Sequence, residues 1–121
     1  MNATKKKIVM WVILGIPALA MLGSAIGKLS GAAPVVEMFT KWNMGQYIFL
    51  IGMIELVSVL LLLIPKTQIV GLLLCNAYLG GAIVTHFQQD GIDKAVPAAV
   101  LLAFIWIGSS LRRPSLTEGL F

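Results

Sequence analysis

Four long apolar segments separated by short polar ones constrain this chain more than any other feature. They cover approximately residues 8–27, 47–64, 69–87 and 96–111. A transmembrane helix needs about 20 mostly apolar residues, so each segment has about the length needed to cross a bilayer. The 121-residue chain is 59% hydrophobic and only 12% charged, which would leave large apolar patches on a soluble domain. We therefore predict an all-α membrane protein. Residues 1–121 would form a single integral membrane domain, with four transmembrane helices in an antiparallel bundle.

The first apolar segment also has features of a secretory signal peptide. Lys5, Lys6 and Lys7 precede it, and Ala18-Leu19-Ala20 resembles a cleavage site. The apolar residues nevertheless continue to Ile26, which gives about the length of a full span. We expect an uncleaved first transmembrane helix, with a cleaved signal peptide as the alternative.

The basic residues predict the orientation of the chain, because cytoplasmic loops of membrane proteins are enriched in Lys and Arg. Four spans place both termini on one side. That side carries six basic residues: Lys5, Lys6, Lys7, Lys66, Arg112 and Arg113. The other side carries three: Lys28, Lys41 and Lys94. We expect a multi-pass protein of the cell inner (cytoplasmic) membrane with both termini in the cytoplasm. The basic residues form no stripe along a helix, so the net charge of +4 does not indicate nucleic-acid binding.

The loop between the first two spans has a helical pattern of its own. Pro34 suits the first turn of a helix, and apolar residues follow at helical spacing on one face: Val35, Met38, Phe39 and Trp42. We predict a short amphipathic interfacial helix at about residues 34–43, on the outer membrane surface or dipping into it. Trp42 and Tyr47 are residue types that anchor chains at that interface. The alternative is a solvated loop.

Glu55 is the one acidic residue inside an apolar segment. A carboxylate at the centre of a transmembrane helix costs roughly 2.5–3.5 kcal/mol or more, so it needs a partner, a proton or a cavity. Gly52, Glu55 and Ser58 follow one another at intervals of three and share a helix face. Because lipid offers no hydrogen bonds, we expect this face to point into the bundle.

Other polar residues are expected near Glu55. Counting back and forward equally from Lys66 places Glu55 and Tyr78 at similar depth on adjacent antiparallel helices, where the tyrosine hydroxyl would donate to the carboxyl group. Lys28 and His86 are expected nearer the outer side, and the Lys28 side chain would point inward or snorkel outward. We predict a polar ligand-binding pocket, open to the outer leaflet, lined by Lys28, Glu55, Tyr78 and His86. The alternative is that these residues only hold helices together.

The chain lacks the residues that most cofactors require. It has one cysteine, Cys75, and one histidine, so we expect no metal site and no haem held by two histidines. No phosphate-binding or dinucleotide-binding loop and no nucleophile elbow is present. We therefore expect no intrinsic cofactor and assign no catalytic residue. Asn76 lies off the polar face of its helix and is a candidate for a second interhelical bond or a subunit contact.

Over about residues 10–113 the sequence resembles the DoxX-like family of small four-helix membrane proteins. The resemblance rests on short motifs in a specific order: Gly27-Lys28-Leu29, the amphipathic stretch with Phe39, Gly52-x-x-Glu55, Ile64-Pro65-Lys66-Thr67, Gly71, Gly80-Gly81-Ala82-Ile83, His86, Pro97 and Arg112-Arg113. It implies a four-helix bundle and an association with quinol or quinone chemistry, since the family takes its name from a small subunit of a terminal quinol oxidase. It also implies a ligand site at Lys28, Glu55 and His86.

Three functions follow as expectations. The first is an accessory subunit, or a binder of a small lipophilic ligand such as a quinone, in a redox system whose partner enzyme supplies electron transfer. The second is a small proton-coupled transporter of lipophilic compounds, which would also require a homodimer. The third is a structural or assembly subunit without a ligand. The lipid bilayer is the partner that all three share.

Overall fold

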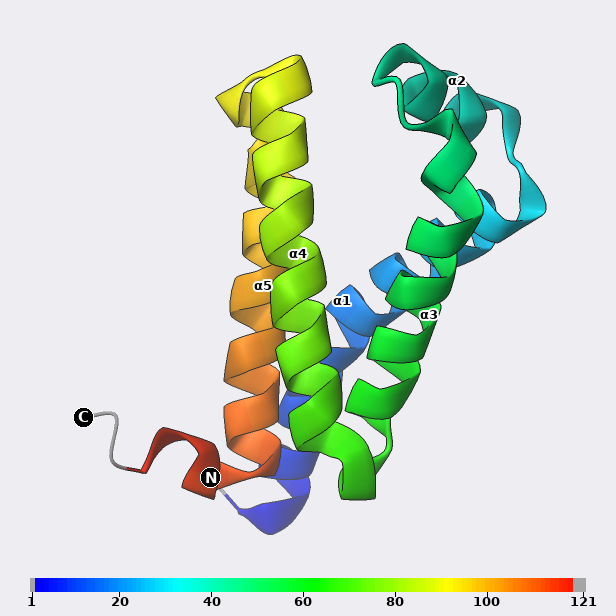
Figure 1. The fold of residues 1–121 in the computed structure, drawn as a ribbon. Helices are drawn as coiled ribbons and strands as arrows, with labels where there is room; N and C mark the ends of the chain where they lie inside the picture. The colour runs from blue at the N-terminus through cyan, green and yellow to red at the C-terminus, as the bar shows by residue number, and fades with distance from the viewer. Residues whose placement is uncertain (1, 119–121) are drawn as a thin grey trace.

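The computed structural model describes residues 2–118 and consists of helices and short connections, without a β-strand in that range (Figure 1). Four helices are long and apolar enough to cross a membrane: α1 (Ala3–Ser30), α3 (Ile48–Leu63) together with the turn before it, α4 (Gln68–Asp90) and α5 (Ile92–Arg112). The short helix α2 (Ala33–Lys41) lies between α1 and α3. Three 3₁₀ turns complete the chain, at Gly45–Tyr47, Pro65–Thr67 and Pro114–Thr117. The predicted all-α membrane fold is confirmed.

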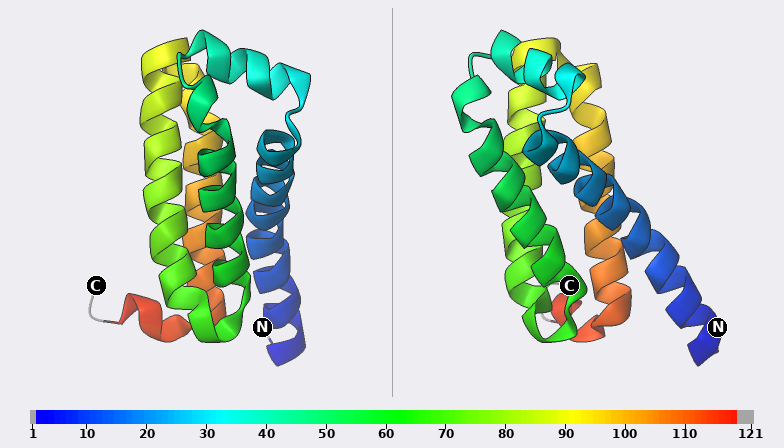
Figure 2. Two further views of the ribbon diagram at one scale, coloured as in Figure 1. Left: turned by 45° about the vertical axis from the view of Figure 1, so that its right-hand side comes forward. Right: turned by 90° about the vertical axis from the view of Figure 1, so that its right-hand side faces the viewer.

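The four long helices form a ring in which each helix packs against two others, in the order α1, α3, α4, α5 (Figures 1 and 2). Short connections make sequence neighbours antiparallel. The turn Pro65–Thr67 joins α3 to α4, and Gly91 alone separates α4 from α5. Gly91 has φ 98°, a conformation that residues with a Cβ seldom adopt, so glycine is what allows so tight a reversal.

The end of the bundle near the termini is closed by apolar packing. Fully buried side chains at this end include Leu14, Val59, Leu62 and Ile105. Toward the other end, α1 and α3 diverge from α4 and α5, and α2 lies at that end, next to the start of α3 (Figure 1). The bundle therefore has one closed end and one end where the helices leave room between them.

Arg112 ties the closed end together. Its guanidinium donates hydrogen bonds to the carbonyl oxygens of Leu62 (3.1 Å) and Leu63 (2.7 Å) at the end of α3. The last carbonyls of a helix have no intrahelical donor, so these bonds satisfy groups that would otherwise lack a partner. The same guanidinium lies 5.3 Å from the ring centroid of Trp11, a cation–π distance that links α5 to α1 as well.

Two helix starts differ from the sequence prediction. α1 begins at Ala3 rather than near residue 8, because the Asn2 side chain accepts a hydrogen bond from the Lys5 N–H (2.8 Å) and caps the helix. α5 begins at Ile92 rather than near residue 96, directly after the turn at Gly91. Pro97 therefore lies inside α5 and leaves one carbonyl of that helix without its usual donor.

Helix α2 has the predicted amphipathic pattern, and its apolar face packs against the rest of the protein. Phe39 and Trp42 are buried and Met38 is half-buried, whereas Glu37 and Lys41 are exposed. The apolar face thus packs over the open end of the bundle and is not left for lipid alone. The alternative of an unstructured solvated loop is wrong for this segment.

Helices α3 and α4 approach most closely where Gly71 faces the backbone of α3. A Cβ atom added at Gly71 would overlap the backbone at Leu61 and Leu62, far inside any ordinary contact distance. Backbone atoms cannot rotate away as a side chain can, so the helix contact requires glycine here.

Substituting this glycine should therefore loosen the closed end. We expect Gly71→Ala to lower the free energy of unfolding by about 1–3 kcal/mol or more, because α3 and α4 must separate. Thermal unfolding in detergent, followed by circular dichroism, measures the loss. Gly15→Ala is the control, because a Cβ there meets nothing within 4 Å and alanine favours the helix. Equal stability of the two variants would contradict the close contact.

Candidate functional site

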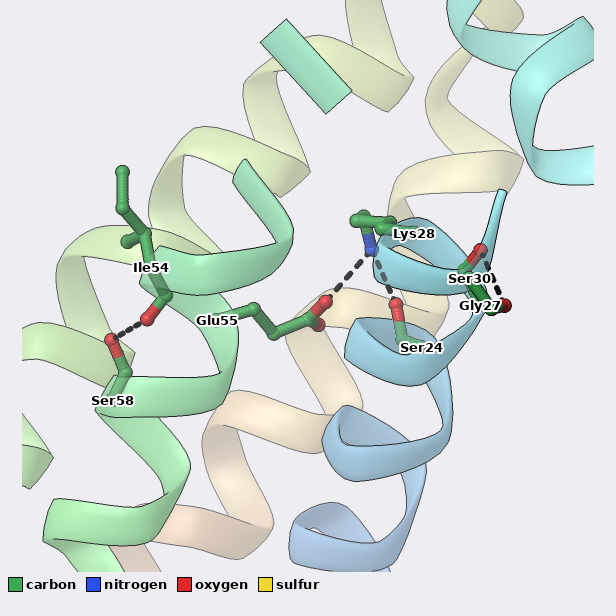
Figure 3. A network of polar contacts seen from close by, with 7 residues as sticks. All are labelled: Ser24, Gly27, Lys28, Ser30, Ile54, Glu55 and Ser58. Carbon is green, nitrogen blue, oxygen red and sulfur yellow. Dashed lines mark hydrogen bonds and ion pairs between the residues drawn. The ribbon is translucent and has the colours of Figure 1, made fainter. Parts of the chain in front are cut away.

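A buried ion pair joins α1 to α3 in the middle of the apolar bundle. Lys28 Nζ lies 2.8 Å from Glu55 Oε1, and only 7% and 3% of the two residues are exposed. The same ammonium donates a hydrogen bond to the Ser24 hydroxyl, one turn earlier on α1 (Figure 3). The partner that a carboxylate in a membrane requires is thus a lysine that points inward rather than snorkelling outward.

The local sequence of α3 brings the two helices close enough for this pair. Gly52 lies one turn before Glu55, and a Cβ there would come within 2.9 Å of Lys28 Cβ. Ser58, one turn after Glu55, donates its hydroxyl to the Ile54 carbonyl at 2.6 Å (Figure 3). Gly52, Glu55 and Ser58 are all buried, as their shared face predicted.

Two aromatic rings complete the surroundings of the ammonium. Lys28 Nζ lies 5.8 Å from the ring centroid of Phe39 on α2 and 5.9 Å from that of Tyr78 on α4. Both are within the range in which the negative ring face attracts a cation. The charge of Lys28 is therefore contacted from four helices: α1, α2, α3 and α4.

Tyr78 lines the same cavity as Glu55, as the depth argument expected. The ammonium of Lys28 donates a hydrogen bond to Glu55 Oε1 at 2.8 Å. A further hydrogen bond from the Tyr78 hydroxyl to the same carboxylate stays a prediction. The depth argument related only α3 and α4, whereas Lys28 comes from α1.

His86 lies further along α4 and contacts α2. Its ring packs edge-on against Trp42, with centroids 5.0 Å apart and planes at 88°. Its Nδ1 is 3.9 Å from Asp90 Oδ2, a long ion-pair distance with both side chains partly exposed. His86 therefore belongs to the rim of the site, where α2 meets α4, and Lys28 and Glu55 to its interior.

A cavity of about 960 Å³ connects these groups. All five helices contribute to its wall, and most of that wall is apolar. Its titratable or hydroxyl-bearing side chains are Ser24, Lys28, Glu55, Tyr78, Thr85, His86, Asp90 and Lys94. The four residues predicted for the pocket, Lys28, Glu55, Tyr78 and His86, thus line one continuous space. In the part of the chain that the structure describes, no three His, Cys, Asp or Glu side chains gather as a metal site would require.

Two lining residues were not assigned to the pocket from the sequence. Trp42, expected to anchor the chain at the membrane surface, is buried against His86, and its indole N–H has no hydrogen-bond partner among residues 2–118. Ser24 binds the ammonium of Lys28. The spacing Ser24-x-x-x-Lys28 was the available signal, since residues four apart are neighbours on a helix. No sequence signal placed Trp42 beside His86.

A comparison with known protein families gives one match. The sequence matches the DoxX-like family over residues 12–108, a range that covers α3, α4, most of α1 and α5, and both Lys28 and Glu55. The chain belongs to the DoxX-like family. No curated protein and no solved structure matches it. The site of this DoxX-like protein is therefore interpreted from its own geometry.

The ion pair of the DoxX-like protein can be tested by a double-mutant cycle. We expect Glu55→Gln to lower the free energy of unfolding by about 3 kcal/mol, because it leaves the ammonium of Lys28 buried without its counter-charge. Lys28→Met should also destabilise the protein. The double variant should lose less free energy of unfolding than the two single variants together, which corresponds to a coupling of about 1–3 kcal/mol between the two positions.

Unfolding in mixed micelles, followed by tryptophan fluorescence, measures the three variants against the parent protein. Ser58→Ala serves as the control, because that hydroxyl bonds to its own helix and not to the pair. Additive losses, with no coupling between positions 28 and 55, would contradict the direct contact.

Proposed function

We propose that this DoxX-like protein binds a small lipophilic ligand of the quinone or quinol type in the cavity at Lys28 and Glu55, as an accessory subunit of a redox system. The observation that carries the proposal is the placement of one charged pair in the wall of a large and otherwise mostly apolar cavity. Ligand pockets typically have about 300–1,000 Å³, mostly apolar walls and a few polar groups that fix orientation.

The polar groups of the cavity suit a carbonyl-bearing ring. An ammonium has three N–H donors, and Lys28 uses two of them, on Ser24 and Glu55. The third donor is available to a ligand acceptor. Glu55 is correspondingly placed to accept from a ligand hydroxyl. One pair of neighbouring side chains thus offers a donor for the oxidised form and an acceptor for the reduced form.

The aromatic residues of the wall favour a flat ligand. Phe39, Trp42 and Tyr78 come from two helices and line the space beside the ammonium. Aromatic side chains bury large apolar areas and stack on planar rings in offset or edge-on arrangements. The chain contributes binding and orientation in this proposal, and a partner enzyme supplies the electron transfer.

The proposed membrane placement rests on the distribution of basic residues. The excess of Lys and Arg near the termini supports an inner-membrane protein with both termini in the cytoplasm. Helix α2 lies at the end of the bundle opposite the termini (Figure 2). With this orientation, that end faces the outer leaflet. A ligand dissolved in that leaflet would reach Lys28 and Glu55 without crossing the closed end.

Filling the cavity tests the proposal directly. We expect Ala82→Phe to lower the affinity for decylubiquinone at least tenfold in lipid nanodiscs, because Ala82 lines the cavity and a phenyl ring would occupy the ligand space. Equilibrium binding to loaded and empty nanodiscs separates specific binding from partition into lipid. Ala99→Phe on α5 is the matched control, because Ala99 is exposed and outside the cavity wall.

A second variant tests whether the Glu55 carboxylate contributes to recognition of the ligand. Glu55→Gln should change the ratio of quinol to quinone affinity, because an amide replaces the carboxylate acceptor. Saturable binding that neither Ala82→Phe nor Glu55→Gln alters would place the ligand elsewhere. Absence of saturable binding in the parent protein would leave the polar residues as helix-packing groups and would refute the proposal.

A further inference from the structure

The outer surface of α4 and α5 carries a polar pair that faces lipid. The indole N–H of Trp106 donates to Asn76 Oδ1 at 3.1 Å, linking α5 to α4. The pair lies on the outside of the bundle, and Asn76 is exposed. Tyr78 and Glu55 line the cavity, whereas Asn76 and Trp106 do not. The pair is therefore not part of the proposed ligand site.

Asn76 lies deep in the membrane-spanning part of α4. It follows Gln68, the first residue of the helix, by eight positions, which corresponds to about 12 Å along the axis. Its level is therefore within the hydrocarbon, where water is not available as a partner. Any hydrogen-bonding group at this depth must be satisfied by protein.

The bond to Trp106 satisfies only part of the Asn76 amide. The amide carries two N–H donors and a carbonyl oxygen with two lone pairs. Trp106 occupies one lone pair, and the structure records no acceptor for either N–H among residues 2–118. Two donors and one acceptor position thus point toward lipid.

We propose that this surface is the interface of a two-fold homodimer, in which Asn76 of each copy donates to Asn76 Oδ1 of the other. A primary amide is self-complementary, because it offers both a donor and an acceptor. Both copies insert with the same orientation, so the two-fold axis is parallel to the membrane normal. That axis brings Asn76 to the same depth in both copies, as a reciprocal contact requires.

The neighbouring surface permits the close approach that such bonds need. Gly80 lies one turn after Asn76, and a Cβ there would meet nothing within 4 Å. No bulky side chain at that position keeps a second helix away, and small residues at helix contacts let backbones come together in membranes. The shape at Gly80 and the unmet donors of Asn76 are independent observations on one face of α4.

Resonance energy transfer in lipid vesicles tests the dimer. Donor and acceptor dyes are attached to a cysteine added after Phe121 in the Cys75→Ala background, and the protein is diluted with phosphatidylcholine and phosphatidylglycerol. We expect transfer that falls on dilution as a dimer dissociates. Asn76→Leu should weaken association about 5–10-fold, which corresponds to two bonds of the strength usual between membrane helices.

Gly80→Leu provides a second variant that does not depend on the amide. Its side chain enters open space on the lipid side, so the monomer should fold, while the dimer should be lost. Gly23→Leu on α1 is the matched control, because a Cβ there also meets nothing within 4 Å, and it should dimerise like the parent.

Several outcomes would overturn the proposal. A parent protein that is monomeric at every lipid dilution would show that another partner, or none, covers Asn76. Unchanged association of Asn76→Leu would show that the amide is not at the interface. Equal effects of Gly80→Leu and Gly23→Leu would show that α4 has no special role. Decylubiquinone binding is measured separately, so failure of the dimer and failure of the ligand site are distinguishable.

Discussion

The ion pair of Lys28 and Glu55 is the interaction on which the interior of this protein depends. A lone carboxylate in the middle of an apolar helix is costly, and a lone ammonium is equally costly. Their 2.8 Å contact offsets part of both costs, and it requires a close approach of α1 and α3, which Gly52 allows. The pair fixes how α1 lies against α3. The ammonium also faces rings from α2 and α4, so it contacts all the helices around it at the end of the bundle away from the termini except α5.

The two ends of the bundle solve opposite problems. At the closed end, Gly71 brings α3 against α4, and Arg112 satisfies the last carbonyls of α3. At the open end, the helices leave a cavity of about 960 Å³, and α2 covers it with the apolar face that ends in Phe39 and Trp42. The close contact of α3 and α4 near their turn thus lies at the end of the bundle away from the cavity.

The sequence predicted what depends on local patterns. Hydropathy revealed the four spans, spacing by three revealed the buried face of Gly52, Glu55 and Ser58, and helical periodicity revealed α2. The sequence alone did not show that the Lys28 side chain pairs with Glu55. The short turn near Lys66 relates depths on α3 and α4, but α2 and its flanking turns separate α1 from α3, so their register follows from packing. A lysine side chain is also long enough to point either way.

Polar side chains in the membrane-spanning helices are of two kinds. Some have hydrogen-bond partners within the chain, and others have donors or acceptors that the chain leaves unused. Gln68 donates to the Ser109 carbonyl (3.3 Å), so its polar side chain has a partner within the chain. Ser109 Oγ, buried without a partner among residues 2–118, is an exception at the closed end. Elsewhere, unused donors occur on Lys28 and Trp42 in the cavity wall and on Asn76 facing lipid. Since lipid offers these groups no hydrogen bonds, the two proposals place a small ligand in the cavity and a second copy of the chain at Asn76.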